Sequence, residues 1–130
     1  MVLGPDNSIR SVDYHTAGEP FRIVDACYLE GTTVLEKRSW AMENLDDLRQ
    51  FLVAEPRGHA DMYGGFVVPA NDPLGDIGVV FFHNDGFSTA CGHGTIALVT
   101  WAIDTGVVAT FGTKTQVMVD VPSGRLVTEA

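Results

Sequence analysis

One cysteine, placed where a glycine-rich segment meets an apolar run, is the best candidate for a reactive group. Cys91 lies in the stretch STACGHGTIALVTWAI, residues 88–103, and Gly92 and Gly94 follow it on either side of His93. If a helix begins at this joint, its first backbone N–H groups lack partners and carry the positive end of the helix dipole. That environment stabilises a thiolate. The sequence therefore predicts a partly accessible Cys91 thiol with a lowered pKa.

The glycines beside this thiol predict an anion site. Gly92 and Gly94 carry no side chain, so a ligand can approach the backbone N–H groups closely. Free N–H groups at a helix start bind carboxylates, and His93 between the glycines can donate a further hydrogen bond. A thiolate base beside a carboxylate site favours proton abstraction at the carbon next to a carboxylate.

Other interpretations of the cysteines stay open at this point. Most cysteines in small domains are inert core residues, and Cys27, inside the apolar segment FRIVDACYL, is assigned to that class. A zinc site is not expected, because Cys91 and His93 are too close in sequence for the usual ligand pairs. A thiol hydrolase is an alternative, in which Cys91 pairs with another histidine. The spacing selects none of the three candidates, His15, His59 or His83.

Hydrophobic patterning predicts a domain that mixes strands and helices. Runs rich in β-branched and aromatic residues predict strands, and leucines at helical spacing predict a helix. We expect strands at 21–29, 33–36, 65–69 and 77–83, and a hairpin over 116–130 that turns at Pro122–Gly124.

Two helices complete this prediction. The first covers residues 39–54, begins at Ser39 or Asn44 and ends before Pro56. The second runs from Gly92 to Thr105, with Gly106 as its C-cap. It is apolar nearly all round, so we expect it to be buried in the core. The buried face of the first helix is expected to carry Ala41, Leu45, Leu48 and Leu52.

Composition limits the partners and the location of the protein. The 130 residues carry a formal net charge of −9, which argues against nucleic acid and anionic membranes as partners. The start, MVLGPDNSIRSVD, lacks the apolar core of a signal peptide, and no stretch is long enough for a membrane span. Two cysteines are few for a secreted disulfide scaffold. We therefore expect a reduced, cytoplasmic domain; the net charge says little about binding of a zwitterionic small molecule.

Three segments resemble the proline racemase family, which includes hydroxyproline 2-epimerases and trans-3-hydroxy-L-proline dehydratases. They are DYHTAGEPFRIV (13–24), EPRGHADMYGGFVVP (55–69) and FFHNDGFSTACGHGTIAL (81–98). The resemblance implies a diaminopimelate-epimerase-like α/β fold. Each of its two halves has a curled, mostly antiparallel sheet around a central helix, which here begins near Cys91. It also implies an active site without cofactor or metal, between the halves.

The resemblance assigns roles to the glycine-rich segment. Cys91 matches the family's first acid/base residue. Gly92 and His93 match residues that hold the substrate carboxylate, and we assign Gly94 to substrate binding with them. Ala90 stands where the family usually has methionine, which is a small departure at the pocket lining.

The length of the family's members, more than twice that of this chain, implies that residues 1–130 are an N-terminal domain whose C-terminal partner domain is absent. The second acid/base residue belongs to that partner, so we expect the fragment alone to be inactive. The segments HNDGFSTACGHG and EKRSW look most like the dehydratases. The alternatives are a proline racemase, a 4-hydroxyproline 2-epimerase, or a domain that only binds ligand or assembles. A homodimer is expected to use apolar surface near Tyr63, Phe66, Phe87 and the start of the central helix.

Overall fold

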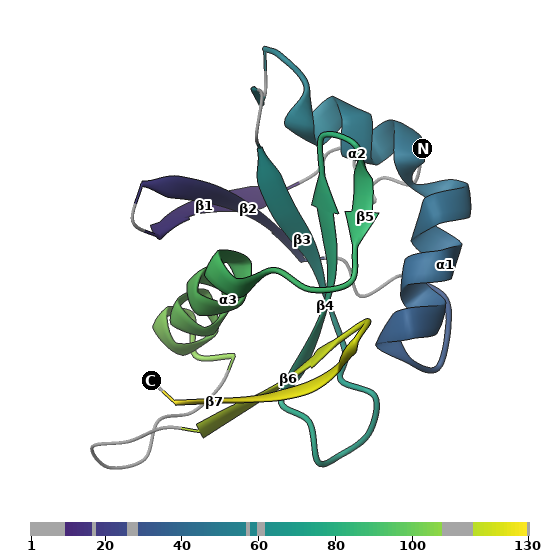
Figure 1. The fold of residues 1–130 in the computed structure, drawn as a ribbon. Coiled ribbons are helices and arrows are strands. Elements are labelled where there is room, and N and C mark those ends of the chain that lie inside the picture. Colours follow the sequence, from purple (N-terminus) through teal and green to yellow (C-terminus); the bar gives the residue numbers. More distant parts are fainter. Residues whose placement is uncertain are drawn as a thin grey trace.

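The computed structural model describes residues 10–16, 18–25, 29–56, 58–59, 62–107 and 116–129. These residues form one seven-stranded sheet with helices on both faces (Figure 1). The strand order is β1-β2-β3-β4-β6-β7, and β5 pairs with β4. The strands are β1 (Ser11–Thr16), β2 (Glu19–Asp25), β3 (Tyr63–Val68), β4 (Ile77–His83), β5 (Gly86–Ser88), β6 (Gln116–Val121) and β7 (Gly124–Glu129). The helices are α1 (Val34–Asn44), α2 (Asp46–Val53) and α3 (Gly92–Asp104).

The sheet is mixed, as the sequence predicts. The pairs β2–β3 and β4–β6 are parallel, and the other four pairs are antiparallel. The predicted α/β fold with a mostly antiparallel sheet and a helix beginning at Cys91 is confirmed. The predicted strand over 77–83 matches β4, and the predicted hairpin matches β6 and β7 with a turn at Pro122–Ser123. Part of the strand predicted over 21–29 lies outside the described residues.

Two hydrophobic clusters cover the two faces of the sheet. Successive side chains of a strand point to opposite faces, so β4 contributes Val79 and Phe81 to the cluster under α3. Val80 and Phe82 of the same strand belong to the cluster under α1 and α2. Burial on both faces explains why this strand is apolar without alternation.

The first helical region begins earlier than the sequence interpretation places it. Thr33 is the N-cap of α1: its hydroxyl accepts a hydrogen bond from the Glu36 N–H at 3.2 Å, and the Glu36 carboxylate accepts one from the Thr33 N–H. The predicted strand at 33–36 and the predicted N-caps Ser39 and Asn44 are therefore wrong. The segment Thr33–Glu36 matches a capping box, a helix-start signal that outweighs its β-branched residues.

The predicted single helix over 39–54 is two helices. The backbone of Leu45 departs from helical geometry, with φ −119° and ψ 13°, and separates α1 from α2. The predicted apolar face survives this break, because all four of its residues are buried. The helix α2 ends at Val53, before Pro56 as expected.

The helix α3 lies on one face of the sheet and is not enclosed on every side by the described residues. Leu98 and Ala102 are fully buried, but Ile96 is 58% exposed and Thr100 is also exposed. The prediction that this helix is buried all round is therefore wrong for its Ile96 face. The helix ends one residue earlier than predicted: Asp104 is its last residue, Thr105 rather than Gly106 is the C-cap, and Gly106 follows with a positive φ of 76°.

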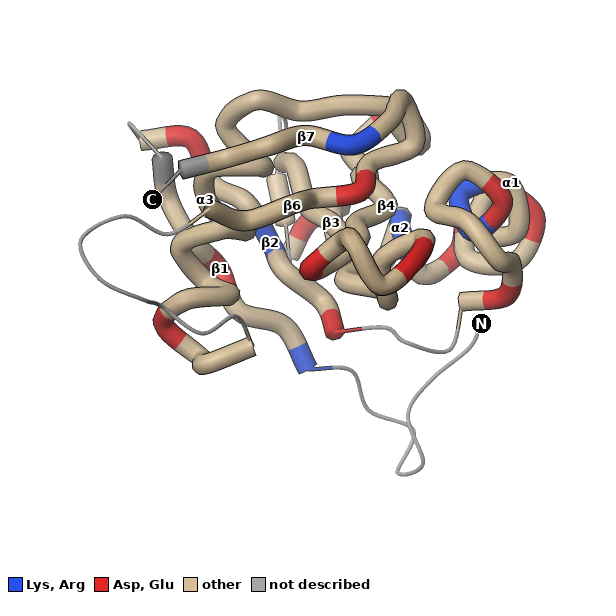
Figure 2. Tube along the Cα trace, turned by 90° about the horizontal axis from the view of Figure 1, so that it is seen from below, with Lys and Arg blue, Asp and Glu red and all other residues tan. Residues whose placement is uncertain are grey.

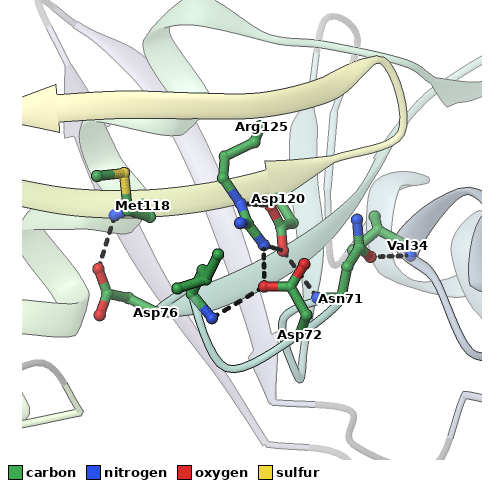
Figure 3. A network of polar contacts seen from close by, with 8 residues as sticks. Val34, Asn71, Asp72, Asp76, Met118, Asp120 and Arg125 are labelled. Carbon is green, nitrogen blue, oxygen red and sulfur yellow. Dashed lines mark hydrogen bonds and ion pairs between the residues drawn. The ribbon is translucent and has the colours of Figure 1, made fainter.

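A buried carboxylate ties the β6–β7 hairpin to the loop between β3 and β4 and, through it, to the start of α1 (Figure 3). Asp120 is fully buried and accepts hydrogen bonds from Arg125 at 2.6 and 2.8 Å and from the Asn71 N–H at 2.7 Å. Arg125 also pairs with Asp72 at 2.9 Å, and the Asn71 side chain accepts from the Val34 N–H, the first amide of α1. We call these residues, Asn71, Asp72, Asp120 and Arg125, the Asp120 network.

Acidic residues outnumber basic ones, 17 to 8, and some of the basic side chains form ion pairs within the fold. Figure 2 shows acidic positions spread over helices and strands, with the fewer basic positions scattered among them. Arg22 pairs with Asp13 and Arg49 with Asp46, each at 2.8 Å. Over the residues that the structure describes, no helix has the length and apolar character needed to cross a membrane.

Candidate functional site

The first turn of α3 presents Cys91 as the sequence predicts. Cys91 is the N-cap residue and has an extended backbone. Its carbonyl accepts hydrogen bonds from the Thr95 N–H at 2.9 Å and from the Thr95 hydroxyl at 2.8 Å. The thiol is free and the residue is partly buried. The predicted position at a helix start and the predicted partial accessibility are therefore confirmed. Cys27 lies outside the described residues.

The protonation of Cys91 differs from the prediction. Burial raises the pKa of the Cys91 thiol above its ordinary value, and the opposing effect of the Gly94 N–H is smaller. The prediction of a lowered pKa is therefore wrong for the described residues by themselves. The helix start supplies few donors to the sulfur, while the partial removal of water disfavours the thiolate.

His93 is the histidine that lies beside this thiol. The Cys91 Sγ atom is 3.5 Å from His93 Nδ1 and 3.9 Å from Nε2. The candidate hydrolase partners receive no support from the described contacts. His83 Nδ1 accepts a hydrogen bond from the Asp85 N–H at 3.1 Å, and His15 and His59 are exposed.

A row of rings crosses the sheet below the start of α3. The register places Tyr14 of β1 beside Phe21 of β2, Phe21 beside Tyr63 of β3, and Tyr63 beside His83 of β4. We call these four residues the aromatic row. The His93 ring stands nearly perpendicular to Tyr63, with centroids 5.0 Å apart, and to Phe21, at 6.3 Å. Such edge-to-face contacts fix the orientation of the imidazole.

The two glycines of the segment have different surroundings. A Cβ atom at Gly92 would meet nothing within 4 Å, so the backbone there is open to a ligand. A Cβ atom at Gly94 would lie 2.5 Å from Phe21 Cε1. Gly94 therefore has a packing reason to lack a side chain, which the sequence did not reveal because Phe21 is 73 positions away.

A groove runs from Cys91 along the exposed side of α3. Its volume is about 410 Å³, and its wall opposite the helix is β7. The lining residues are mostly apolar: Ala90, Cys91, Gly92, Thr95, Ile96, Val99, Thr100, Leu126 and Thr128. The described residues contain no group of three or more His, Cys, Asp or Glu side chains that could hold a metal ion.

The groove exposes the apolar side chains of Ile96 and Leu126 next to the start of α3, which is one part of the apolar surface that the sequence predicts. Phe66 is fully buried and Phe87 is 9% exposed, so the prediction is wrong for these two rings. Both phenylalanines pack in the cluster under α1 and α2. The homodimer itself stays a prediction.

Several curated proteins are similar to this chain. It is 47% identical over 119 residues to the trans-3-hydroxy-L-proline dehydratase of Burkholderia ambifaria, covering 90% of this chain and 36% of that protein. It is 51% identical over 124 residues to the trans-L-3-hydroxyproline dehydratase of Xenopus tropicalis, covering 93% and 35%. A 3-hydroxyproline 2-epimerase of Burkholderia multivorans is 46% identical over 119 residues, covering 90% and 36%. The chain thus spans about a third of the length of these relatives.

The fold and the sequence point to the same family. A crystal structure of a hydroxyproline epimerase from Agrobacterium vitis with bound trans-4-hydroxy-L-proline superposes with a TM-score of 0.85 at 25% identity. The match covers 94% of this chain and 37% of that one. The sequence model of the family "Proline racemase" matches residues 11–130. The chain therefore belongs to the proline racemase family.

Proposed function

We propose that this chain supplies one acid/base residue, the Cys91 thiol, to an enzyme that removes the α-proton of a proline derivative without a cofactor. The observation that carries the proposal is the start of α3, where Cys91 lies beside His93 and the open backbone at Gly92. The relatives named as dehydratases of trans-3-hydroxy-L-proline support dehydration of that compound as the reaction.

The proposed mechanism uses the groups at the start of α3. The α-proton of an amino acid is weakly acidic, so its removal requires stabilisation of the developing negative charge. Gly92, His93 and Gly94 hold the substrate carboxylate with N–H donors, which gain strength in a site that excludes water. The Cys91 thiolate takes the α-proton, the 3-hydroxyl leaves with a proton as water, and the enamine product relaxes to a cyclic imine acid.

A second candidate is epimerisation, in which the proton returns to the opposite face of the α-carbon. The relative named as a 3-hydroxyproline 2-epimerase, at 46% identity, favours it. Both reactions share the first step at Cys91. They differ in the second step, and the product of the reaction distinguishes them.

A chimera tests this proposal. Replacing the matched 119 residues of the Burkholderia ambifaria dehydratase with this chain is expected to give a protein that dehydrates trans-3-hydroxy-L-proline. Cys91→Ser should reduce that activity to background, because an alcohol is a far weaker acid than a thiol and cannot serve as the base. Cys27→Ser is the matched control and should retain it. A folded chimera without activity, or activity that survives Cys91→Ser, contradicts the proposal; the 2-epimer as the only product favours the second candidate.

We also propose that residues 1–130 are the N-terminal domain of a two-domain enzyme, with the second acid/base residue in the other domain. The chain alone is then expected to exchange no α-proton of L-proline or trans-3-hydroxy-L-proline in D2O above background. The groove beside Cys91 is open to water, which weakens the electrostatic stabilisation of a carbanion. Proton NMR of the α-position measures the exchange. A rate that rises clearly above background and disappears in Cys91→Ser would contradict this expectation.

A further inference from the structure

We propose that Tyr63 is a positioning residue that holds the His93 imidazole beside the Cys91 thiol, and that this imidazole accepts the thiol proton. The inference rests on the proposed function only in treating Cys91 as the base. It assigns the activation of the thiol to a side chain on α3 and the orientation of that side chain to the sheet.

The geometry of His93 supports the first part. Cys91 Sγ lies 3.5 Å from Nδ1 and 3.9 Å from Nε2, so Nδ1 is the nearer acceptor for the thiol proton. The step is a simple transfer: the S–H bond of Cys91 breaks, an N–H bond forms on His93, and a thiolate beside an imidazolium results. The attraction between the two charges favours this pair in a partly buried site. It opposes the effect of burial, which by itself keeps the thiol protonated.

The position of Tyr63 in the aromatic row supports the second part. Tyr63 has a neighbour on each side, Phe21 on β2 and His83 on β4, so its ring has little freedom to move. Its centroid lies 5.8 Å from that of His83, and the Asp85 N–H in turn fixes the His83 ring. Phe21 supports His93 from a greater distance, 6.3 Å against 5.0 Å for Tyr63. Tyr63 is therefore the nearer support of the imidazole.

The other end of the row provides a control. Tyr14 belongs to the same row and the same hydrophobic cluster, but its hydroxyl donates to Asp104 at 2.9 Å, at the last residue of α3. The helix α3 has 13 residues and is about 20 Å long, so Tyr14 and Tyr63 support opposite ends of it. Loss of Tyr14 removes packing under α3 without touching His93.

The rate of Cys91 alkylation by iodoacetamide, measured from pH 5 to pH 10 by mass spectrometry, tests the proposal. Among the described residues, titratable groups near His93 include Cys91, Tyr63 and, behind Tyr63, His83. The wild-type chain is expected to keep a measurable rate near pH 6. His93→Gln and Tyr63→Leu should each lower that rate about tenfold, which corresponds to one pKa unit of the thiol. Tyr63→Phe, which keeps the ring, should restore the wild-type profile.

Each result decides the proposal. The proposal is overturned if Tyr63→Leu or His93→Gln keeps the wild-type pH profile of Cys91 alkylation. It is also overturned if the profile of Tyr14→Leu shifts as far as that of Tyr63→Leu. Circular dichroism identifies variants that do not fold. If Tyr63→Leu does not fold, Tyr63→Met takes its place, and the same tenfold loss of alkylation rate is expected. The alkylation experiment uses no substrate, so it tests the roles of Tyr63 and His93 separately from the proposed function. An inactive chimera would contradict only the proposed function.

Discussion

Asp120→Ala is expected to lower the free energy of unfolding by about 3 kcal/mol, the cost of leaving buried hydrogen-bond donors without an acceptor. Asp120 is fully buried, and its carboxylate is the acceptor for Arg125 and for the Asn71 N–H. Its loss removes the acceptor of the Asn71 N–H and leaves Arg125 with Asp72 as its partner in the Asp120 network. Urea unfolding followed by circular dichroism measures the change.

A matched control, Asp72→Ala, separates the effect of losing a buried carboxylate from the effect of losing a negative charge beside Arg125. Asp72 accepts from the same guanidinium, but its side chain is 49% exposed and water can replace it. Asp72→Ala is therefore expected to change the free energy of unfolding much less than Asp120→Ala. Equal losses in the two variants would contradict the assignment of the buried carboxylate as the centre of the network.

The Asp120 carboxylate should also make the free energy of unfolding fall at acidic pH. The hydrogen bonds from Arg125 and from the Asn71 N–H hold the pKa of the Asp120 carboxyl below its ordinary value in the folded chain. The unfolded chain then binds the proton first, so this stability is complete above the unfolded pKa of about 4 and is lost as pH falls through the folded pKa. Asp120→Asn should remove this part of the acid dependence. An unchanged slope below about pH 4 would contradict it.

The sequence predicted local features of the fold better than long-range ones. The strand β4, the helix α3 and the β6–β7 hairpin each have a continuous pattern or a clear turn, and all three were predicted within a few residues. The start of α1 was missed because three β-branched residues, Thr32 to Val34, precede the helical leucines. The Thr33–Glu36 capping box was the available signal.

The candidate site was predictable to the same extent. The placement of Cys91 at a helix start follows from the residues next to it. Its pKa direction does not, because burial depends on β7 and on residues far along the chain. The contact between His93 and Tyr63 joins positions 30 apart, and depends on a strand register that periodicity alone cannot supply.

Gly94→Ala is the second substitution for which we expect a large effect, about 2 kcal/mol of destabilisation. The new Cβ atom would lie 2.5 Å from the ring of Phe21, which is fully buried. Phe21 cannot turn away freely, since it also packs against Phe81 with ring centroids 6.0 Å apart. Overpacking of this kind costs about 1–3 kcal/mol, and the better helix propensity of alanine offsets at most about 1 kcal/mol. Thermal unfolding followed by circular dichroism measures the difference.

Gly92→Ala is the matched control, since it makes the same substitution two positions earlier in α3. No atom lies within 4 Å of its Cβ, so we expect a change in the free energy of unfolding within about 0.5 kcal/mol of zero. The comparison removes helix propensity as the cause, because propensity favours alanine at both positions. If Gly94→Ala instead raises the free energy of unfolding, the ring of Phe21 must move to make room for the new Cβ atom. The contact between Phe21 and His93 must then loosen. The same variant should then show a Cys91 alkylation profile displaced towards that of His93→Gln, which connects the packing beneath α3 to the chemistry at its start.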